Sequence, residues 1–298
     1  MDGSIRTIVF GIGELDREDP HLGSAADLAA RLGATLHVVH AFQLPDPAMY
    51  PYPEMSVFSP RAIDEMATGA QKRVEERTRA ISGGAEVLSR ALPGPADRAV
   101  LDVAGEVDAD LILVGATRRS RVGRAVLGTT AQRIVRSATI PVLVMRSPEA
   151  AAYRRVLLTT DLSDLSARAH EHGTRLVTAL AAKHDEPELR TLLVVNYDMP
   201  LPPPLGESAV DEVAHSKLDA FLKRVAPTTV AENRAIRVGD PAEEITAEAG
   251  EWNADLIVLG THGRTGASRF LIGSVAESAL KNAPCDVLVI PNPGRSPE

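Results

Sequence analysis

Three glycines and a serine near the C-terminal end of the sequence have the spacing of a phosphate-binding loop. Gly260 and Gly263 are separated by two residues, and Gly273 and Ser274 follow after nine more. Glycine permits positive φ and lets backbone N–H groups approach a phosphate with no Cβ in the way. The start of a helix adds unpaired N–H groups and positive dipole density. We therefore expect phosphate binding at this loop.

Two further side chains extend this expectation to a nucleotide. Ser274 stands three residues before Glu277, which is the spacing of a capping box. Its hydroxyl is thus expected either to cap the helix or to donate to a phosphate. Asp161 directly follows a strand-like segment, and a carboxylate at such a strand end suits hydrogen bonds to ribose hydroxyls.

Short apolar runs alternate with helical periods around these residues. The expected strands are Val156–Thr160, Thr191–Val195, Ala231–Val238, Leu256–Gly260 and Asp286–Ile290. The expected helices are Ser166–Ala182, Ser208–Val225, Pro241–Gly250 and Ser274–Asn282. Asp240 is the expected N-cap of the third helix, with Pro241 at its first position. Alternation of this kind predicts a parallel α/β sheet, which binds ligands at the carboxyl ends of its strands.

The sequence repeats itself, so this architecture occurs twice. Asp108–Gly115 reappears as Asn253–Gly260, at an offset of 145 residues. We expect two doubly wound, Rossmann-like open-sheet domains in tandem, spanning residues 1–147 and 152–298. Each ends in an apolar strand, Val142–Met145 or Val287–Ile290. Because an exposed apolar edge favours aggregation, these strands are expected to bring the two domains together as an intrachain pseudo-dimer.

Composition narrows the function classes. The 298 residues carry a formal net charge of -8, which argues against nucleic-acid binding because a phosphate backbone is held by a basic surface. No apolar run approaches the roughly 20 residues that span a bilayer, and no apolar signal region is seen at the N-terminus. Cys285 is the single cysteine and is expected to pack as a small hydrophobe. We expect a cytoplasmic protein with no membrane partner.

Taken together, these segments resemble the universal stress protein family. The resemblance covers residues 153–293 and, more weakly, 5–146. It rests on Asp161 after the first strand, the turn 239–243, the glycine pattern from Gly260 to Ser274, and the last strand. In ATP-binding members that glycine pattern wraps the phosphates and ribose, the first-strand Asp holds the adenosine moiety, and a second-strand valine contacts adenine. The resemblance therefore implies a nucleotide site made of Asp161, Val194, Gly260, Gly263, Gly273 and Ser274.

The first domain departs from this pattern in two places. Arg118 stands where the second glycine belongs, and Gly13 replaces the first-strand Asp. Gly115, Gly128 and Thr129 keep the remaining spacing. Two readings stay open: a weaker second nucleotide site at these three residues, or a solvated basic loop on a domain kept for its fold.

Several other sequence features give weaker indications of function. Gly11 and Gly13 follow a strand, but Asp16 occupies the third glycine position, so the dinucleotide fingerprint fails. His262 is expected in a solvated loop, and Glu248 on a solvated helix face. The Pro-rich segments Gln43–Pro60 and Asn196–Glu207 are expected to form lids or interfaces. No catalytic residue set and no metal site can be assembled.

The function expected is that of an ATP-binding stress-response or regulatory protein. The ligand is ATP, with or without Mg²⁺, held mainly in the second domain, and hydrolysis is at most slow because nothing evident positions an attacking water. A homodimer of the chain is a further option. The alternative is a nucleotide-independent scaffold that presents surfaces to protein partners.

Overall fold

The sequence folds into strands and helices that alternate along the chain. The computed structural model describes residues 4–15, 18–44, 60–79, 81, 84–116, 127–148, 153–181, 186–196, 207–225, 232–261 and 272–292. The first half contains β1 (Thr7–Ile12), α1 (Leu22–Leu32), β2 (Thr35–Phe42), α2 (Pro60–Arg79), β3 (Val87–Pro93), α3 (Ala96–Glu106), β4 (Leu111–Gly115), α4 (Thr129–Ser137) and β5 (Val142–Met145). The second half contains β6 (Arg155–Thr160), α5 (Asp164–Leu180), β7 (Glu188–Val195), α6 (Glu207–Val225), β8 (Glu232–Val238), α7 (Pro241–Glu251), β9 (Leu256–Gly260), α8 (Ser274–Asn282) and β10 (Asp286–Ile290).

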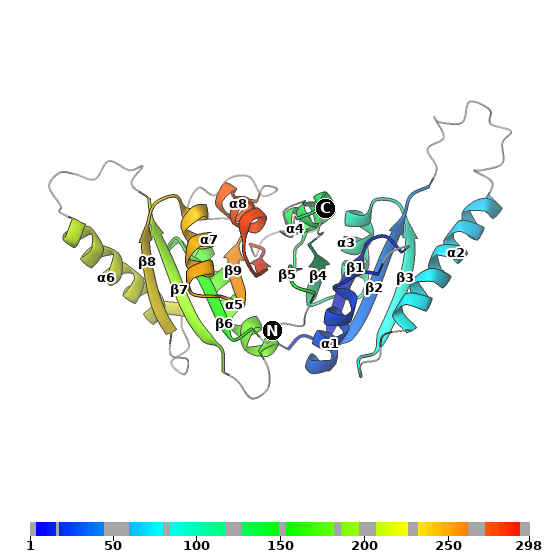
Figure 1. Cartoon of the computed structure of the whole chain (residues 1–298), viewed down its shortest axis with the longest axis horizontal. Coiled ribbons are helices and arrows are strands. Elements are labelled where there is room, and N and C mark those ends of the chain that lie inside the picture. The colour runs from blue at the N-terminus through cyan, green and yellow to red at the C-terminus, as the bar shows by residue number, and fades with distance from the viewer. Residues whose placement is uncertain are drawn as a thin grey trace, which may run out of the picture.

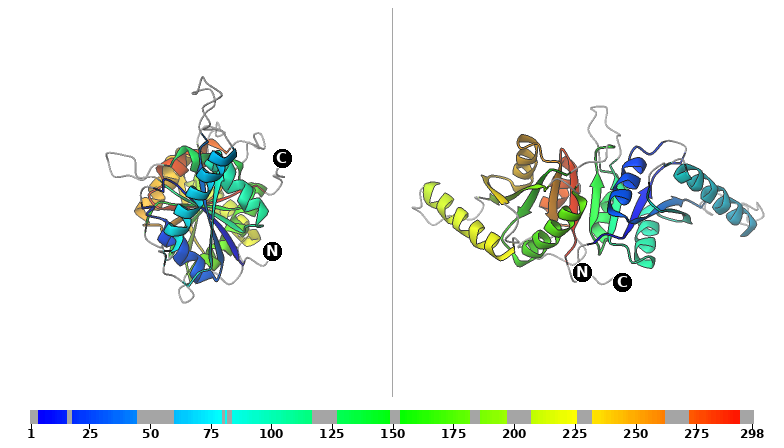
Figure 2. Two further views of the ribbon diagram at one scale, coloured as in Figure 1. Left: turned by 90° about the vertical axis from the view of Figure 1, so that its right-hand side faces the viewer. Right: turned by 90° about the horizontal axis from the view of Figure 1, so that it is seen from below.

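The ten strands of the described residues belong to one sheet in the order β3-β2-β1-β4-β5-β10-β9-β6-β7-β8. Neighbouring strands within each half are parallel, as the long helical crossovers require. Figure 1 shows the two halves side by side, with α2 and α6 at the two outer ends of the molecule. The view from below in Figure 2 shows the same arrangement. The predicted α/β class with two doubly wound halves in tandem is confirmed.

The two halves meet where their last strands pair. β5 and β10 run antiparallel, with Val144 opposite Val287 and Val142 opposite Val289. The predicted pairing of these two apolar strands is therefore confirmed. It joins what were expected to be two separate sheets into one and leaves neither apolar edge bare, which removes an aggregation risk.

Each face of the sheet carries a hydrophobic core that runs through both halves, and a smaller third cluster packs α6 against β7. On one face, Phe10 of β1 and Leu143 of β5 belong to the same buried cluster as Leu288 of β10, together with residues of α1 and α5. On the other face, Ile112 and Ile257 belong to a second cluster with α3, α4, α7 and α8. Because strands covered on both faces bury every side chain, they read as continuous apolar runs in the sequence.

The repeated segment before β4 and β9 pins the first strand of each half. The Asp110 carboxylate accepts hydrogen bonds from the N–H groups of Arg6 and Thr7 at 2.8 and 3.0 Å. Asp255 does the same for the two residues at the start of β6, at 2.8 and 2.9 Å. The repeat therefore encodes the same strand-start clamp twice.

A buried carboxylate fastens the segment between the halves. Asp286 is 3% exposed and accepts hydrogen bonds from the backbone N–H groups of Arg146 (2.7 Å) and Ser147 (3.3 Å). The Tyr153 hydroxyl donates to its second oxygen at 2.8 Å. Burial raises the pKa of Asp286, although these three donors act in the opposite direction. Burial also raises the pKa of the neighbouring Cys285 thiol to about 12, which agrees with its predicted role as a packing residue.

The predicted element boundaries agree closely with the structure in the second half. The strands expected at Leu256–Gly260 and Asp286–Ile290 are β9 and β10, and the helix expected at Ser274–Asn282 is α8. The Pro-rich segments expected as lids lie outside the described residues, apart from a few residues at their ends.

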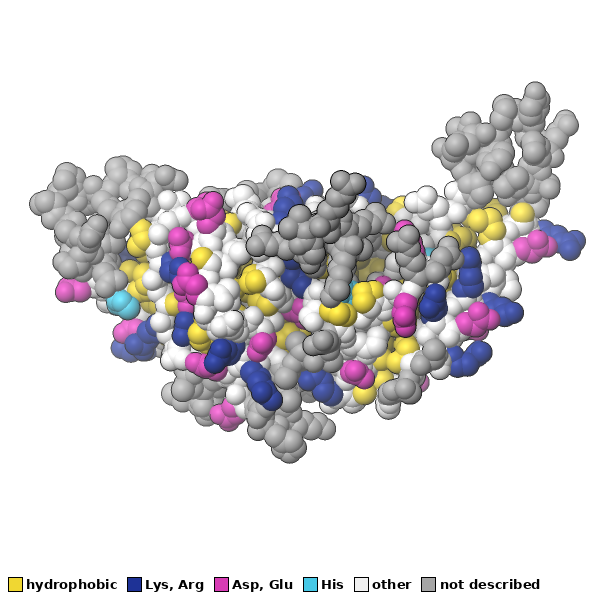
Figure 3. Space-filling view, viewed as in Figure 1, with side chains coloured by type: hydrophobic (Ala, Val, Ile, Leu, Met, Phe, Trp, Pro, Cys, Tyr) yellow, Lys and Arg dark blue, Asp and Glu magenta, His cyan; other side chains and the backbone are white. Residues whose placement is uncertain are grey.

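Charges of both signs are interspersed over the described part of the face seen in Figure 3. Among the described helices, none combines the length and the apolar character that crossing a membrane requires.

The Asp286 cluster yields a test of the junction. Asp286→Ala should lower the free energy of unfolding by about 3 kcal/mol, because three buried donors lose their acceptor. Asp286→Asn keeps an acceptor for the two N–H groups and removes a buried charge, so its stability at pH 7 should equal or exceed that of the wild type.

The pH dependence follows from the raised pKa of Asp286. The native state holds this proton more tightly than the unfolded chain, so the wild type loses stability as pH rises from about 4 through the native pKa. The free energy of unfolding of Asp286→Asn should not fall over this pH range. Urea unfolding of the wild type and of both variants at several pH values measures these free energies. An equal loss of stability in Asp286→Ala and Asp286→Asn would contradict the role of Asp286 as a buried acceptor with a raised pKa.

Candidate functional site

The end of β6 makes a tight turn that fixes Asp161. Its Oδ1 accepts a hydrogen bond from Ser163 N–H at 3.0 Å, and Leu162 between them has a φ of 66°. Ser163 then caps α5, because its hydroxyl accepts from Ser166 N–H at 3.1 Å. The Asp161 carboxylate is thus held at the carboxyl edge of the sheet, where such folds bind ligands.

The end of β9 is tied both to β10 and to the start of α8. Thr261 is 1% exposed, and its N–H donates to Ile290 O at 3.1 Å. Its carbonyl accepts from Gly273 N–H at 2.9 Å, and its hydroxyl accepts from Asn292 N–H at 3.2 Å. These bonds hold Gly273 beside Gly260, although the residues are far apart in the sequence.

One detail at α8 differs from the expectation. Gly273 is the N-cap, with a φ of -61°. Ser274 is the first helical residue and makes no side-chain cap, so the expected capping box is wrong. An N1 side chain cannot reach back to the N–H groups that an N-cap side chain satisfies. Of the two roles weighed for the Ser274 hydroxyl, donation to a ligand remains.

The third part of the site is the start of α7, where the N-cap predicted from the sequence is present. The Asp240 carboxylate accepts from the N–H groups of Ala242 (2.9 Å) and Glu243 (3.0 Å), and Pro241 follows it as the first helical residue. This cap brings Pro241 and Ile245 against the carboxyl ends of β6 and β7.

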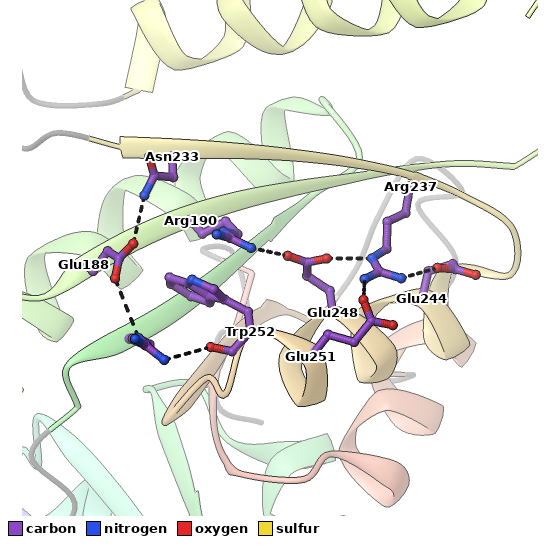
Figure 4. A network of polar contacts seen from close by, with 9 residues as sticks. Glu188, Arg190, Asn233, Arg237, Glu244, Glu248, Glu251 and Trp252 are labelled. Carbon is purple, nitrogen blue, oxygen red and sulfur yellow. Dashed lines mark hydrogen bonds and ion pairs between the residues drawn. The ribbon is translucent and has the colours of Figure 1, made fainter.

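Ion pairs hold α7 to the outer strands, as Figure 4 shows. Glu248 lies between Arg190 of β7 and Arg237 of β8, with a distance of 2.6 Å to each. Glu248 is 6% exposed, so its expected place on a solvated face is wrong. Although burial raises the pKa of Glu248, hydrogen bonds from the two arginines outweigh burial and lower it. Trp252, at the end of α7, lies under the Arg190 guanidinium at 4.3 Å.

The end of β6, the junction of β9 with α8 and the start of α7 line an open cavity of about 270 Å³. Its described lining is Thr159, Thr160, Asp161, Ser166, Leu192, Val194, Pro241, Ile245, Leu259, Gly260, Thr261, Gly273, Ser274, Val275 and Ala276. Polar groups come from the strand ends and from α8, whereas aliphatic side chains of β7, β9 and α7 form an apolar part. Asp161 is the one charged side chain among the described lining residues.

Five of the six residues expected at the site line this cavity: Asp161, Val194, Gly260, Gly273 and Ser274. Gly263 lies outside the described residues, as do His262 and Arg118. Ser166 of α5 and Ile245 of α7 also line the cavity and were missed, because only the packing of these helices on the sheet brings them there.

The candidates in the first half stand at the equivalent edge but outside this cavity. Gly115 ends β4, Gly128 is the N-cap of α4, and Thr129 is its first residue. The ring of His21 occupies the space beside Gly115, since a Cβ added there would lie 2.5 Å from the ring. On the other face of the sheet, a Cβ at Gly11 would lie 2.9 Å from Val100.

His21 makes the first-half edge differ from the second. Its ring is 3% exposed, with Nε2 3.2 Å from Ala116 O and Nδ1 3.1 Å from Ser147 O. Ala116 is the counterpart of Thr261, whose carbonyl instead accepts from Gly273. In the first half, the Ala116 carbonyl therefore contacts the His21 side chain at the start of α1. In the second half, the equivalent carbonyl of Thr261 accepts the Gly273 N–H instead.

Comparison with known sequences gives two matches to a single family. The sequence profile of the universal stress protein family matches residues 4–146 and again residues 152–291. A universal stress protein of Methanocaldococcus jannaschii is 35% identical over 149 residues, which are 47% of this chain and 84% of that protein. One from Mycobacterium tuberculosis is 27% identical over 302 residues and covers 95% of this chain and 96% of its own length.

Solved structures agree on the fold. A putative universal stress protein from Pseudomonas aeruginosa has a TM-score of 0.65 at 20% identity and covers 98% of this chain and 95% of its own. A universal stress protein from Archaeoglobus fulgidus has the same TM-score at 19% identity, with 97% of this chain and 98% of its own covered. Both profile matches and these whole-chain likenesses lead to one conclusion: the chain belongs to the universal stress protein family, in its tandem form.

Proposed function

We propose that the second half binds an adenine ribonucleotide, ATP with or without Mg²⁺, in the cavity between β6, β9, α7 and α8. The protein would then act as a nucleotide-binding regulatory protein of a cytoplasmic stress response. The domains proposed for these roles are residues 1–147 and 152–298, as expected from the sequence.

The observation that carries this proposal is the position of the α8 N-terminus. Ser274, Val275 and Ala276 all line the cavity, and the first N–H groups of a helix have no intrahelical partner. Glu277, the next residue, already donates its N–H to Gly273 O at 2.9 Å. Three backbone donors and the positive end of the helix dipole thus meet at the cavity, which suits phosphate oxygens.

The rest of the lining fits the other parts of a nucleotide. The Asp161 carboxylate would accept hydrogen bonds from the ribose hydroxyls, since a carboxylate can accept two hydrogen bonds from a diol. Leu192, Val194 and Ile245 offer an apolar wall for a flat base. The described lining contains no nucleophile with an adjacent base, so we propose binding with at most slow hydrolysis.

Calorimetry with ATP should give about one tight site per chain. The second half carries Asp161 and Gly263, whereas the first has Gly13 and Arg118 at these positions. Gly115, Gly128 and Thr129 would form at most a weaker second site. Asp161→Asn should weaken the tight site at least tenfold, which requires a loss of about 1.4 kcal/mol.

Asp164→Asn is the matched control, because Asp164 pairs with Arg224 at 3.0 Å and does not line the cavity. Two sites of equal affinity, or binding in the first half alone, would contradict the assignment to the second half. If the folded protein binds no adenine nucleotide, the scaffold alternative takes its place.

Gly273→Ala tests whether phosphates approach Gly273, because it should change ATP affinity without changing the stability of the fold. At φ -61° any residue is tolerated, and an added Cβ would lie 3.5 Å from Thr261 O, an ordinary contact. The melting temperature should therefore stay close to that of the wild type, while ATP affinity falls because the methyl group faces the approaching phosphates. Gly250→Ala in α7 is the control, since it has open space around it. Unchanged affinity in Gly273→Ala would show that phosphates do not approach this residue.

Gly263→Arg copies Arg118 of the first half into the second, and the prediction rests on the glycine pattern alone. If Gly263 has a positive φ, an arginine there costs about 1 kcal/mol or more, and its Cβ would obstruct the phosphates. Its charge acts in the opposite direction but is screened by salt and solvent. We expect an intact fold and at least tenfold weaker ATP binding by calorimetry. Equal or tighter binding would restore the first half as a candidate site.

A further inference from the structure

The helix that lines the nucleotide cavity is also contacted by two arginines from the other half. α8 begins at the cavity with Ser274 and ends at Asn282, close to the junction of the halves. α4 of the first half lies across the centre of the molecule from it, as Figure 1 shows. The contacts come from Arg136 on α4 and from Arg146, the residue after β5.

Arg146 contacts the C-terminal end of α8. Its side chain is 9% exposed, and Nη2 donates a hydrogen bond to Leu280 O. Leu280 lies in the last turn of α8, where carbonyl groups have no intrahelical donor. A cation at this end also complements the helix dipole. The backbone of Arg146 is fixed in turn by its bond to Asp286.

Arg136 contacts α8 near its other end. Its guanidinium lies 3.8 Å from the Glu277 carboxylate, which also pairs with Lys281 at 2.9 Å. A hydrogen bond from Lys281, supported by the charge of Arg136, lowers the pKa of Glu277. Glu277 follows directly on the three residues of α8 that line the cavity. Both ends of the helix are therefore tied to the first half.

The mirror-image contacts lack their charged groups, because the residues differ. At the offset of 145, Gln132 is the counterpart of Glu277 and offers no charge to Lys281, the counterpart of Arg136. Pro291 is the counterpart of Arg146 and has no side-chain donor. Two arginines of the first half therefore contact α8, and α8 offers the Glu277 carboxylate to α4 in return.

We propose that Arg136 and Arg146 are positioning residues through which the first half sets the nucleotide affinity of the second. This inference rests on the proposed nucleotide function. α8 has nine residues and lies between the phosphate site at one end and a guanidinium at the other. A shift of this short helix moves both ends at once, so a ligand at its N-terminus and the arginine at its C-terminus are energetically linked, and the linkage is reciprocal.

The experiment measures ATP affinity in arginine variants of the full chain by calorimetry. Arg146→Met keeps the apolar stem and removes the donor, and we expect about fivefold weaker binding, the lower end of typical coupling between sites. Arg136→Gln should weaken binding about twofold, since exposed ion pairs contribute little. Arg136→Lys should restore wild-type affinity, because it keeps the charge.

Arg133→Gln is the matched control on the same helix. Arg133 pairs with Asp97 at 3.7 Å within the first half and does not contact α8. It should leave ATP affinity unchanged. Hydrogen exchange adds a second readout: in Arg146→Met, amides of α8 should exchange faster than in the wild type, while those of α7 should not change.

The outcomes are distinct. Wild-type affinity in both Arg146→Met and Arg136→Gln would overturn the inference and leave the nucleotide proposal standing, whatever the variants do to the melting temperature. An equal loss in Arg133→Gln would also overturn it, since a general effect of the first half would then explain the data. Absence of ATP binding in the wild type would overturn the nucleotide proposal itself and this inference with it.

Discussion

The antiparallel pairing of β5 with β10 determines how the rest of the molecule is arranged. Both strands are apolar on both faces, so neither can remain at a solvent-exposed edge. Their pairing makes one sheet from two halves and lets a hydrophobic core on each face run through both halves. Asp286, at the start of β10, then fixes the connecting segment with three hydrogen bonds. A chain built in this way has its two halves in a fixed relation.

This fixed relation allows the two halves to diverge. Both keep the aspartate clamp at the first strand, and both keep the last strand, because the fold depends on them. Two differences in the sequence concern the expected ligand site: Gly13 takes the place of Asp161, and Arg118 takes the place of Gly263. In the first half, His21 fills the space beside Gly115. Under the proposed assignment of the ligand to the second half, the first half contributes to stability through the shared sheet and through its contacts with α8.

The sequence predicted those features that depend on short-range pattern. Strand β9 and helix α8 agree with their predicted bounds because an apolar run and a glycine before a helix are local signals. The repeat made the pairing of the last strands predictable as well. Contacts between distant positions were not predictable: Tyr153 donates to Asp286 across 133 residues, and Glu248 is buried because Arg190 and Arg237 lie on the same face of neighbouring strands. The role of Ser274 was ambiguous, since one residue of helix register decides between a cap and a ligand donor.

The identity of the bound molecule tests the account most directly. The protein is purified without added nucleotide, denatured by heat, and the released small molecules are identified and counted by mass spectrometry. We expect an adenine ribonucleotide at about one per chain, and markedly less of it from the Asp161→Asn variant. Release of two nucleotides per chain, or of an equal amount from Asp161→Asn, would contradict a site in the second half.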